Sequence, residues 1–149
     1  MTVEDLLQAL DRKDNTEAYQ ALLELERLSS DSNVLYPYTE KFAEMTESDR
    51  NVVRVRGVRL FCSQAKWDSG SMIDRFLDQV LSVLQDDRPT TVRQTLAALQ
   101  DVVRYKPELR DKIFEVADQI DVIRYKDTMQ GLLIGDIGRL HDTIDKNDE

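Results

Sequence analysis

The chain has 149 residues and carries 20 Lys and Arg against 29 Asp and Glu, which gives a formal net charge of −9 at pH 7. Hydrophobic residues make up 41% of the sequence and lie along its whole length, which excludes the disordered and low-complexity classes and fits one domain. The single cysteine, Cys62, excludes an internal disulfide framework, and no run of about 18 apolar residues is present to span a membrane.

The N-terminal residues carry acids where a secretion signal needs basic residues ahead of an apolar core. Together with the lone cysteine, this favours a protein of the reducing cytoplasm. The acidity of the whole chain also argues against general nucleic-acid binding.

Apolar residues recur at spacings of three and four nearly throughout, which predicts helices, and no segment alternates as a strand does. Thr2, with Asp5 three residues later, predicts a capping box at the start of a first helix. A second helix is expected from Asn15 or Thr16, followed by a polar loop at 29–33.

The next three helices are set off by proline, small polar residues and glycine. Pro37 suits the first turn of a third helix, and a fourth is expected from Ser48 or Asp49 to about Lys66. A loop at 68–70 then leads into the fifth helix.

The last three helices are marked by more regular breaks. Pro89 and Pro107 suit the first turns of a sixth and a seventh helix, and an eighth follows Asp121. We therefore expect a single domain over 1–145 and a frayed polar tail at 146–149.

The helix starts recur at a nearly constant period. The shorter helices begin 36 residues apart, near Leu35, Ser71 and Pro107. The longer helices begin about 40 and 37 residues apart, near Asp49, Pro89 and Lys126. A period of this length predicts helix pairs stacked side by side rather than one closed bundle.

The segment 87–99 resembles the inter-helix turn and second helix of a HEAT repeat, because Asp87 precedes the pair Val92 and Arg93 by five and six residues. The preceding unit keeps Val53-Arg54 but has Ser48 at the Asp position. The last unit has Met129-Gln130 in place of Val-Arg, which suits a capping repeat.

The resemblance to the HEAT/armadillo-like family implies an all-α fold of about eight antiparallel helices, stacked as helix pairs in a right-handed superhelix. On this basis, residues 1–30 form an atypical N-terminal helix pair, 35–121 the best-matched repeats and 122–145 a C-terminal capping repeat. The resemblance also implies that Asp87 and Arg93 form a structural pair that ties adjacent units together.

The fourth predicted helix and its end carry five basic residues and no acid over 50–66. Arg56, Arg59 and Lys66 share one face of the fourth helix, and Arg93 and Arg104 belong to a polar stripe of the sixth. These five residues are the candidate partner-binding residues. The resemblance implies that both stripes lie on the concave surface, where they would bind an acidic peptide, phosphate groups or a nucleic-acid backbone. Intramolecular pairing with acids is the alternative.

Three of the five glycines fall in the last helix, opposite its apolar stripe: Gly131, Gly135 and Gly138. Each costs about 1 kcal/mol against alanine inside a helix. They predict either close packing within the chain, a simple cap, or self-association, so the protein is expected to be a monomer or a homodimer.

No catalytic, metal or cofactor site is expected. His141 is the only histidine and Cys62 the only cysteine, so no zinc site of the His/Cys type can form within one chain. We expect a surface role for His141 and burial for Cys62.

The sequence therefore predicts a non-catalytic scaffold or adaptor that binds another macromolecule, most naturally a protein, through a concave surface. One alternative is nucleic-acid binding or processing, as in the HEAT-like DNA glycosylases that the architecture resembles. Another is an accessory subunit of a larger enzyme system.

Overall fold

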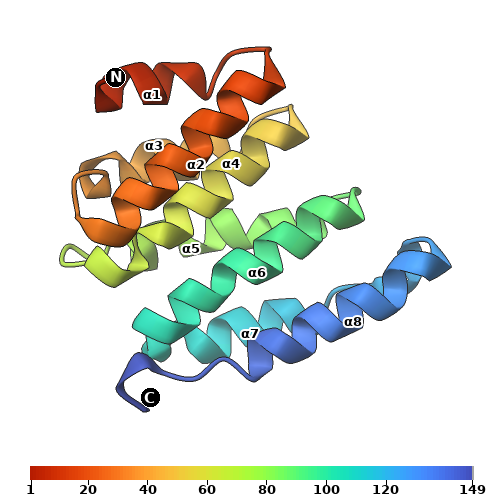
Figure 1. Ribbon diagram of the computed structural model, residues 1–149. Helices are drawn as coiled ribbons and strands as arrows, with labels where there is room; N and C mark the ends of the chain where they lie inside the picture. The colour runs from red at the N-terminus through yellow and green to blue at the C-terminus, as the bar shows by residue number, and fades with distance from the viewer. Residues whose placement is uncertain (149) are drawn as a thin grey trace.

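The computed structural model describes residues 1–148, and over this range the chain forms eight α-helices and no strand (Figure 1). This confirms the all-α prediction. The helices are α1 (Val3–Ala9), α2 (Asn15–Asp31), α3 (Thr39–Met45), α4 (Asn51–Ser63), α5 (Met72–Leu81), α6 (Pro89–Tyr105), α7 (Arg110–Asp118) and α8 (Asp127–His141). Short 3-10 turns join them.

Several helix starts lie where the sequence predicts them. The capping box on α1 is present: the Thr2 hydroxyl accepts a hydrogen bond from the Asp5 backbone N–H, and the Asp5 carboxylate accepts one from Thr2, both at 3.1 Å. Asp14 caps α2 by accepting from the first-turn N–H groups, and α6 opens on Pro89.

Other boundaries differ from the prediction. The expected loop at 29–33 is mostly helix, because α2 continues to Asp31 and buries Ser29. Pro37 and Pro107 each open a 3-10 turn, and the α-helix follows after that turn. In the expected frayed tail at 146–149, residues 146–148 form a 3-10 turn, and residue 149 lies outside the described residues.

The longer helices α2, α4, α6 and α8 lie side by side and run in the same direction, while the shorter helices cover one side of this layer (Figure 1). Helix α4 packs against both α2 and α6, and α6 packs against both α4 and α8. The two central long helices, α4 and α6, are therefore each held between two long neighbours.

One hydrophobic cluster runs through the whole array and draws on all eight helices. The apolar stripe of α6 is almost fully buried: Val92, Leu96, Leu99 and Val103. Because each helix pair buries part of its apolar face against the next pair, the units depend on one another for burial.

Gly57 allows α3 and α4 to approach closely. A Cβ atom built on Gly57 would lie 2.6 Å from the Met45 Cβ and 2.7 Å from the Phe42 carbonyl oxygen. Contacts this short cannot be accommodated without moving the α3 backbone, so this position requires glycine.

The buried carboxylate of Asp68 ties three segments together. It accepts hydrogen bonds from the Tyr36 hydroxyl at 2.6 Å, the Met72 N–H at 2.9 Å and the Lys106 ammonium at 2.9 Å. Burial alone would raise the pKa of Asp68, but the bonds from Tyr36 and Lys106 outweigh it and hold the pKa below its ordinary value.

Replacing Gly57 with alanine is expected to destabilise the protein by about 3 kcal/mol in urea unfolding, because the new methyl group overpacks the α3–α4 contact. Gly131→Ala is the matched control: its Cβ meets nothing within 4 Å, so helix propensity should stabilise that variant by up to about 1 kcal/mol. Equal stability of Gly57→Ala and wild type would contradict the close approach.

Asp68→Asn is expected to cost about 3 kcal/mol at pH 7, because it removes one partner of a buried ion pair. Since the pKa of Asp68 is lowered by folding, this contribution is present above the ordinary value of 3.8 and is lost as the pH falls below it. The stability gap between wild type and variant should therefore shrink in acid, as followed by unfolding curves from pH 7 to 3. The exposed Asp78→Asn serves as control, and a gap independent of pH would argue against the network.

Candidate functional site

A groove runs over the exposed side of α2, α4 and α6. It consists of adjoining hollows that extend from Asn15 and Thr91 at the amino-terminal ends of these helices to Ser30 and Tyr105 at their carboxyl-terminal ends. The groove therefore lies on the layer of second helices, where the family resemblance places the concave surface.

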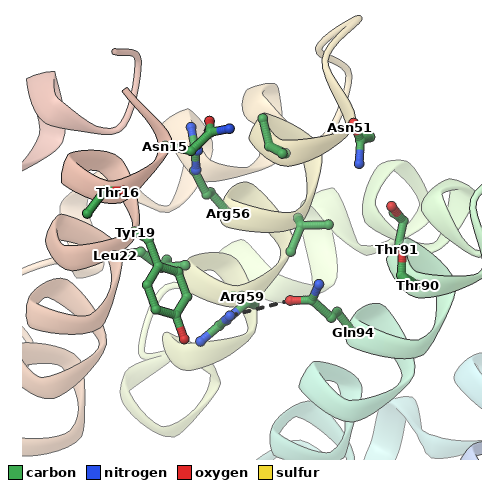
Figure 2. A pocket seen from close by; sticks show the side chains of 12 residues that line it. Asn15, Thr16, Tyr19, Leu22, Asn51, Arg56, Arg59, Thr90, Thr91 and Gln94 are labelled. Atoms are coloured by element: carbon green, nitrogen blue, oxygen red, sulfur yellow. Dashed lines mark hydrogen bonds between the residues drawn. The ribbon is translucent and has the colours of Figure 1, made fainter. Parts of the chain in front are cut away.

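The largest hollow of the groove, which we call the N-end pocket, has a volume of about 450 Å³. It is built from the first turns and following residues of the three helices (Figure 2). Its walls include Asn15, Thr16, Tyr19 and Leu22 from α2, Asn51, Val52, Val55, Arg56 and Arg59 from α4, and Thr90, Thr91 and Gln94 from α6.

The walls of the N-end pocket combine apolar and polar groups. The Tyr19 side chain remains 51% exposed beside the buried Leu22 and Val55. The exposed amide of Gln94 lies opposite, on α6 (Figure 2). Such a surface offers both apolar contact and hydrogen bonds to a bound molecule.

Arg59 connects the three helices that form the groove. Its guanidinium donates to both carboxylate oxygens of Glu26 on α2, at 2.7 and 3.0 Å, and to the Gln94 amide oxygen on α6, at 3.3 Å. Burial would lower the pKa of Arg59, but the hydrogen bonds that Arg59 donates to the Glu26 carboxylate, together with the charge of that carboxylate, outweigh burial and raise the pKa. The charge of Arg59 is therefore largely neutralised within the protein.

Arg56 is the buried cation of the N-end pocket. Its side chain donates to the Leu10 carbonyl oxygen at 2.8 Å and to the Asn15 amide oxygen at 3.2 Å, and the residue is only 5% exposed. Both acceptors are neutral, and no carboxylate among the described residues forms an ion pair with Arg56. Burial lowers the pKa of Arg56 and the nearby charge of Arg50 adds to this effect, while the carboxylate of Asp11, which forms no ion pair with Arg56, opposes it.

Further unpaired donors surround the same pocket. The buried hydroxyl of Thr91 has no hydrogen-bond partner in the described part of the chain. The N-cap residues Arg50 and Arg88 provide no side-chain cap to α4 and α6. No carboxylate among residues 1–148 lines this pocket, and helix amino termini carry partial positive charge, so this end of the groove favours an anion.

The carboxyl-terminal end of the groove is acidic. Glu26 and Asp101 line it together with Ser63 and Lys66. Partial burial raises the pKa of Asp101, and the carboxylate of Glu26 adds to this rise, while Arg104 and Lys66 oppose it. The groove is therefore polarised along its length.

Two members of the predicted basic strip are paired with acids of the same chain, which is the alternative that the sequence left open. Arg59 pairs with Glu26, and Arg93 pairs with Asp136 of α8 at 2.7 Å. Lys66 donates to the Ser30 carbonyl oxygen at 2.8 Å and lies 5.0 Å from the Trp67 ring, and Arg104 lies 5.8 Å from the Tyr105 ring. Partner binding by these basic residues stays a prediction.

The expected structural pair of Asp87 and Arg93 is also corrected. Asp87 pairs with Arg124, and Arg93 pairs with Asp136. The equivalent tie between the preceding units joins Arg54 to Asp86 at 2.7 Å. Because these arginines reach beyond their own helices, the ion pairs link α4 to the segment before α6, and α6 to α8.

The glycines of α8 face open space. A Cβ on Gly131 or Gly138 would meet nothing within 4 Å, and one on Gly135 would meet only the Arg139 guanidinium. Close packing of this face within the described chain is therefore wrong, and self-association through it stays a prediction.

No cluster of three or more His, Cys, Asp and Glu side chains in residues 1–148 is placed to hold a metal ion. His141 contacts the Asp118 carboxylate at 2.6 Å. The Cys62 thiol is buried, which raises its pKa. No helix in the described range is long and apolar enough to cross a membrane.

Sequence reasoning missed several residues of the N-end pocket. It assigned no binding role to Asn15, Tyr19, Thr91 or Gln94, and the structure leaves Tyr19 half exposed in the pocket wall. The period of the helix starts was the one available signal, because it predicts that first turns of successive long helices lie side by side.

Comparison of the chain with family models, with curated proteins and with solved structures found no match. The HEAT-like reading therefore rests on the residues and helix spacing of this chain.

Proposed function

We propose that the protein is a non-catalytic, HEAT-like helical-repeat adaptor of the cytoplasm that binds a segment of another protein along the groove over α2, α4 and α6. The observation that carries this proposal is the groove itself: a hollow continuous over three helices, with the exposed aromatic ring of Tyr19 among amide and hydroxyl groups.

The composition of the groove suits a polypeptide. Tyrosine is enriched at protein interfaces, where its ring gives apolar contact and its hydroxyl remains able to form hydrogen bonds. Asn15 and Gln94 provide amide groups that match the donors and acceptors of a peptide backbone.

The groove is also pre-organised. Arg59 links α2, α4 and α6 by hydrogen bonds, and the Trp67 ring nitrogen donates to the Ser29 carbonyl oxygen at 2.6 Å. A rigid surface loses little conformational entropy when a ligand binds, which favours affinity.

The charges of the groove favour a protein over a nucleic acid. A polyphosphate backbone lying along the groove would meet the carboxylates of Glu26 and Asp101 at the carboxyl-terminal end. A polypeptide can present charges of either sign, so it can match both ends.

The test is affinity capture from the source cells with wild type and with the double variant Tyr19→Ala, Gln94→Ala. Both side chains are exposed, so the variant should remain folded. The matched control replaces the exposed pair Lys112 and Asp78, on α7 and α5, by alanine. A captured protein, once purified, should bind wild type and control equally in calorimetry, and the groove variant at least tenfold more weakly.

Equal binding of every captured protein to the groove variant and to wild type would contradict the proposal. Capture that is abolished by nuclease treatment would instead support nucleic-acid binding.

A further inference from the structure

We propose that the N-end pocket binds an acidic side chain, Asp or Glu, of the partner segment, through Arg56 and the first-turn groups of α4 and α6, while an adjacent apolar side chain of the segment packs on Tyr19 and Val55. This inference rests on the proposed adaptor function, because it assigns the chemistry of the partner at the same groove.

Arg56 carries a buried positive charge and has no bonded carboxylate in the described chain. A buried cation is costly unless a carboxylate compensates it, and Arg56 is 5% exposed with only neutral acceptors. Other cations of the same layer do have carboxylate partners, including Arg54 with Asp86 and Lys106 with Asp68. Asp11 acts on Arg56 through its charge but forms no ion pair with it, so a carboxylate from a ligand would supply the directly bonded counterion that Arg56 lacks among the described residues.

Thr91 adds a buried hydroxyl without a hydrogen-bond partner in the described chain. The residue is 1% exposed and lines the N-end pocket, and its Oγ1 has no hydrogen-bond partner among residues 1–148. A buried hydroxyl without a partner is unfavourable, so a ligand acceptor at this wall would satisfy it.

Helices α4 and α6 both begin at the N-end pocket. The first turns of α4 and α6 open into the pocket, and no acceptor in the described structure binds the backbone N–H groups of Asn51, Val52 or Thr90. Helix α2 differs, since Asp14 already caps it. Two long helices thus direct uncapped amino termini toward the same anion.

The apolar walls restrict the kind of anion. Leu22, Val52 and Val55 line the same pocket as Arg56, and the half-exposed ring of Tyr19 lies in its wall. These walls favour a carboxylate carried beside an apolar side chain, as in a peptide, over a free and strongly hydrated phosphate ion.

The acidic end of the groove adds a second specificity element. Asp101 lies 10 positions beyond Thr91 on α6, which corresponds to about 15 Å along a helix. An extended peptide covers that distance in about five residues. The preferred segment therefore carries an acid next to an apolar residue, and a basic residue about five positions away.

The test uses phage-displayed random 12-residue peptides, fused at their carboxyl ends so that no terminal carboxylate is present, selected against the full-length protein at low salt. Selected peptides are synthesised with blocked ends and measured by fluorescence anisotropy. We expect an Asp or Glu beside an apolar residue. Binding should weaken at least tenfold with Arg56→Met and several-fold with Thr91→Val.

A double-mutant cycle connects the peptide acid to Arg56. Changing that acid to its amide should weaken binding to wild type at least tenfold but cause little further loss with Arg56→Met. Circular dichroism and thermal melting check each variant. Thr91→Val is nearly isosteric and removes an unpartnered hydroxyl, so this variant should fold. It therefore provides a second test of the acidic site if Arg56→Met does not fold.

The possible failures are distinguishable by means of Tyr19→Ala. Two outcomes would overturn the acidic site and leave the adaptor function intact. In one, the peptides lose binding with Tyr19→Ala but carry no acid. In the other, they lose binding with Tyr19→Ala but bind Arg56→Met and Thr91→Val as well as wild type. Selection of no peptide, or only of peptides indifferent to all three substitutions, would overturn both proposals.

Discussion

The structure depends on one constraint: no helix pair can bury its apolar face by itself. The hydrophobic cluster is continuous from α1 to α8 because each pair is closed by the next. Helices α4 and α6, each packed between two long neighbours, hold the centre of this arrangement. Gly57 lets α3 pack against α4 in close contact. The two helices of the central pair can therefore lie near each other within the array.

Stacking of this kind also creates the candidate site. Because the long helices run in the same direction, their amino-terminal ends gather on one edge and their carboxyl-terminal ends on the other (Figure 1). Arg56 lines the groove at one end, where no carboxylate of the described residues does, and the carboxylates of Glu26 and Asp101 line the other end. Arg59 and Arg93 link long helices through carboxylates, whereas Arg56 is bonded only to neutral acceptors of the described chain beside a cavity.

The sequence predicted those features that depend on local chemistry and on period. The capping box at Thr2, the helix start at Pro89 and the buried stripe of α6 follow from short-range rules that the structure obeys. The partners of the cations could not be predicted in this way. Arg93 meets Asp136, 43 residues away, because register between units decides which carboxylate is near. For the same reason, the pattern of basic residues on the fourth helix alone could not predict that Glu26 of α2 lies beside Arg59.

The central claim is that the α2–α4–α6 groove is the partner-binding surface, and photo-crosslinking in the source cells tests it most directly. A benzoylphenylalanine is placed at Gln94, in the groove, and in a parallel strain at the exposed Asp78, on α5 in the other layer. The account predicts a discrete protein adduct from position 94 and none from position 78. Adducts from position 78 alone, or no difference between the two positions, would contradict it.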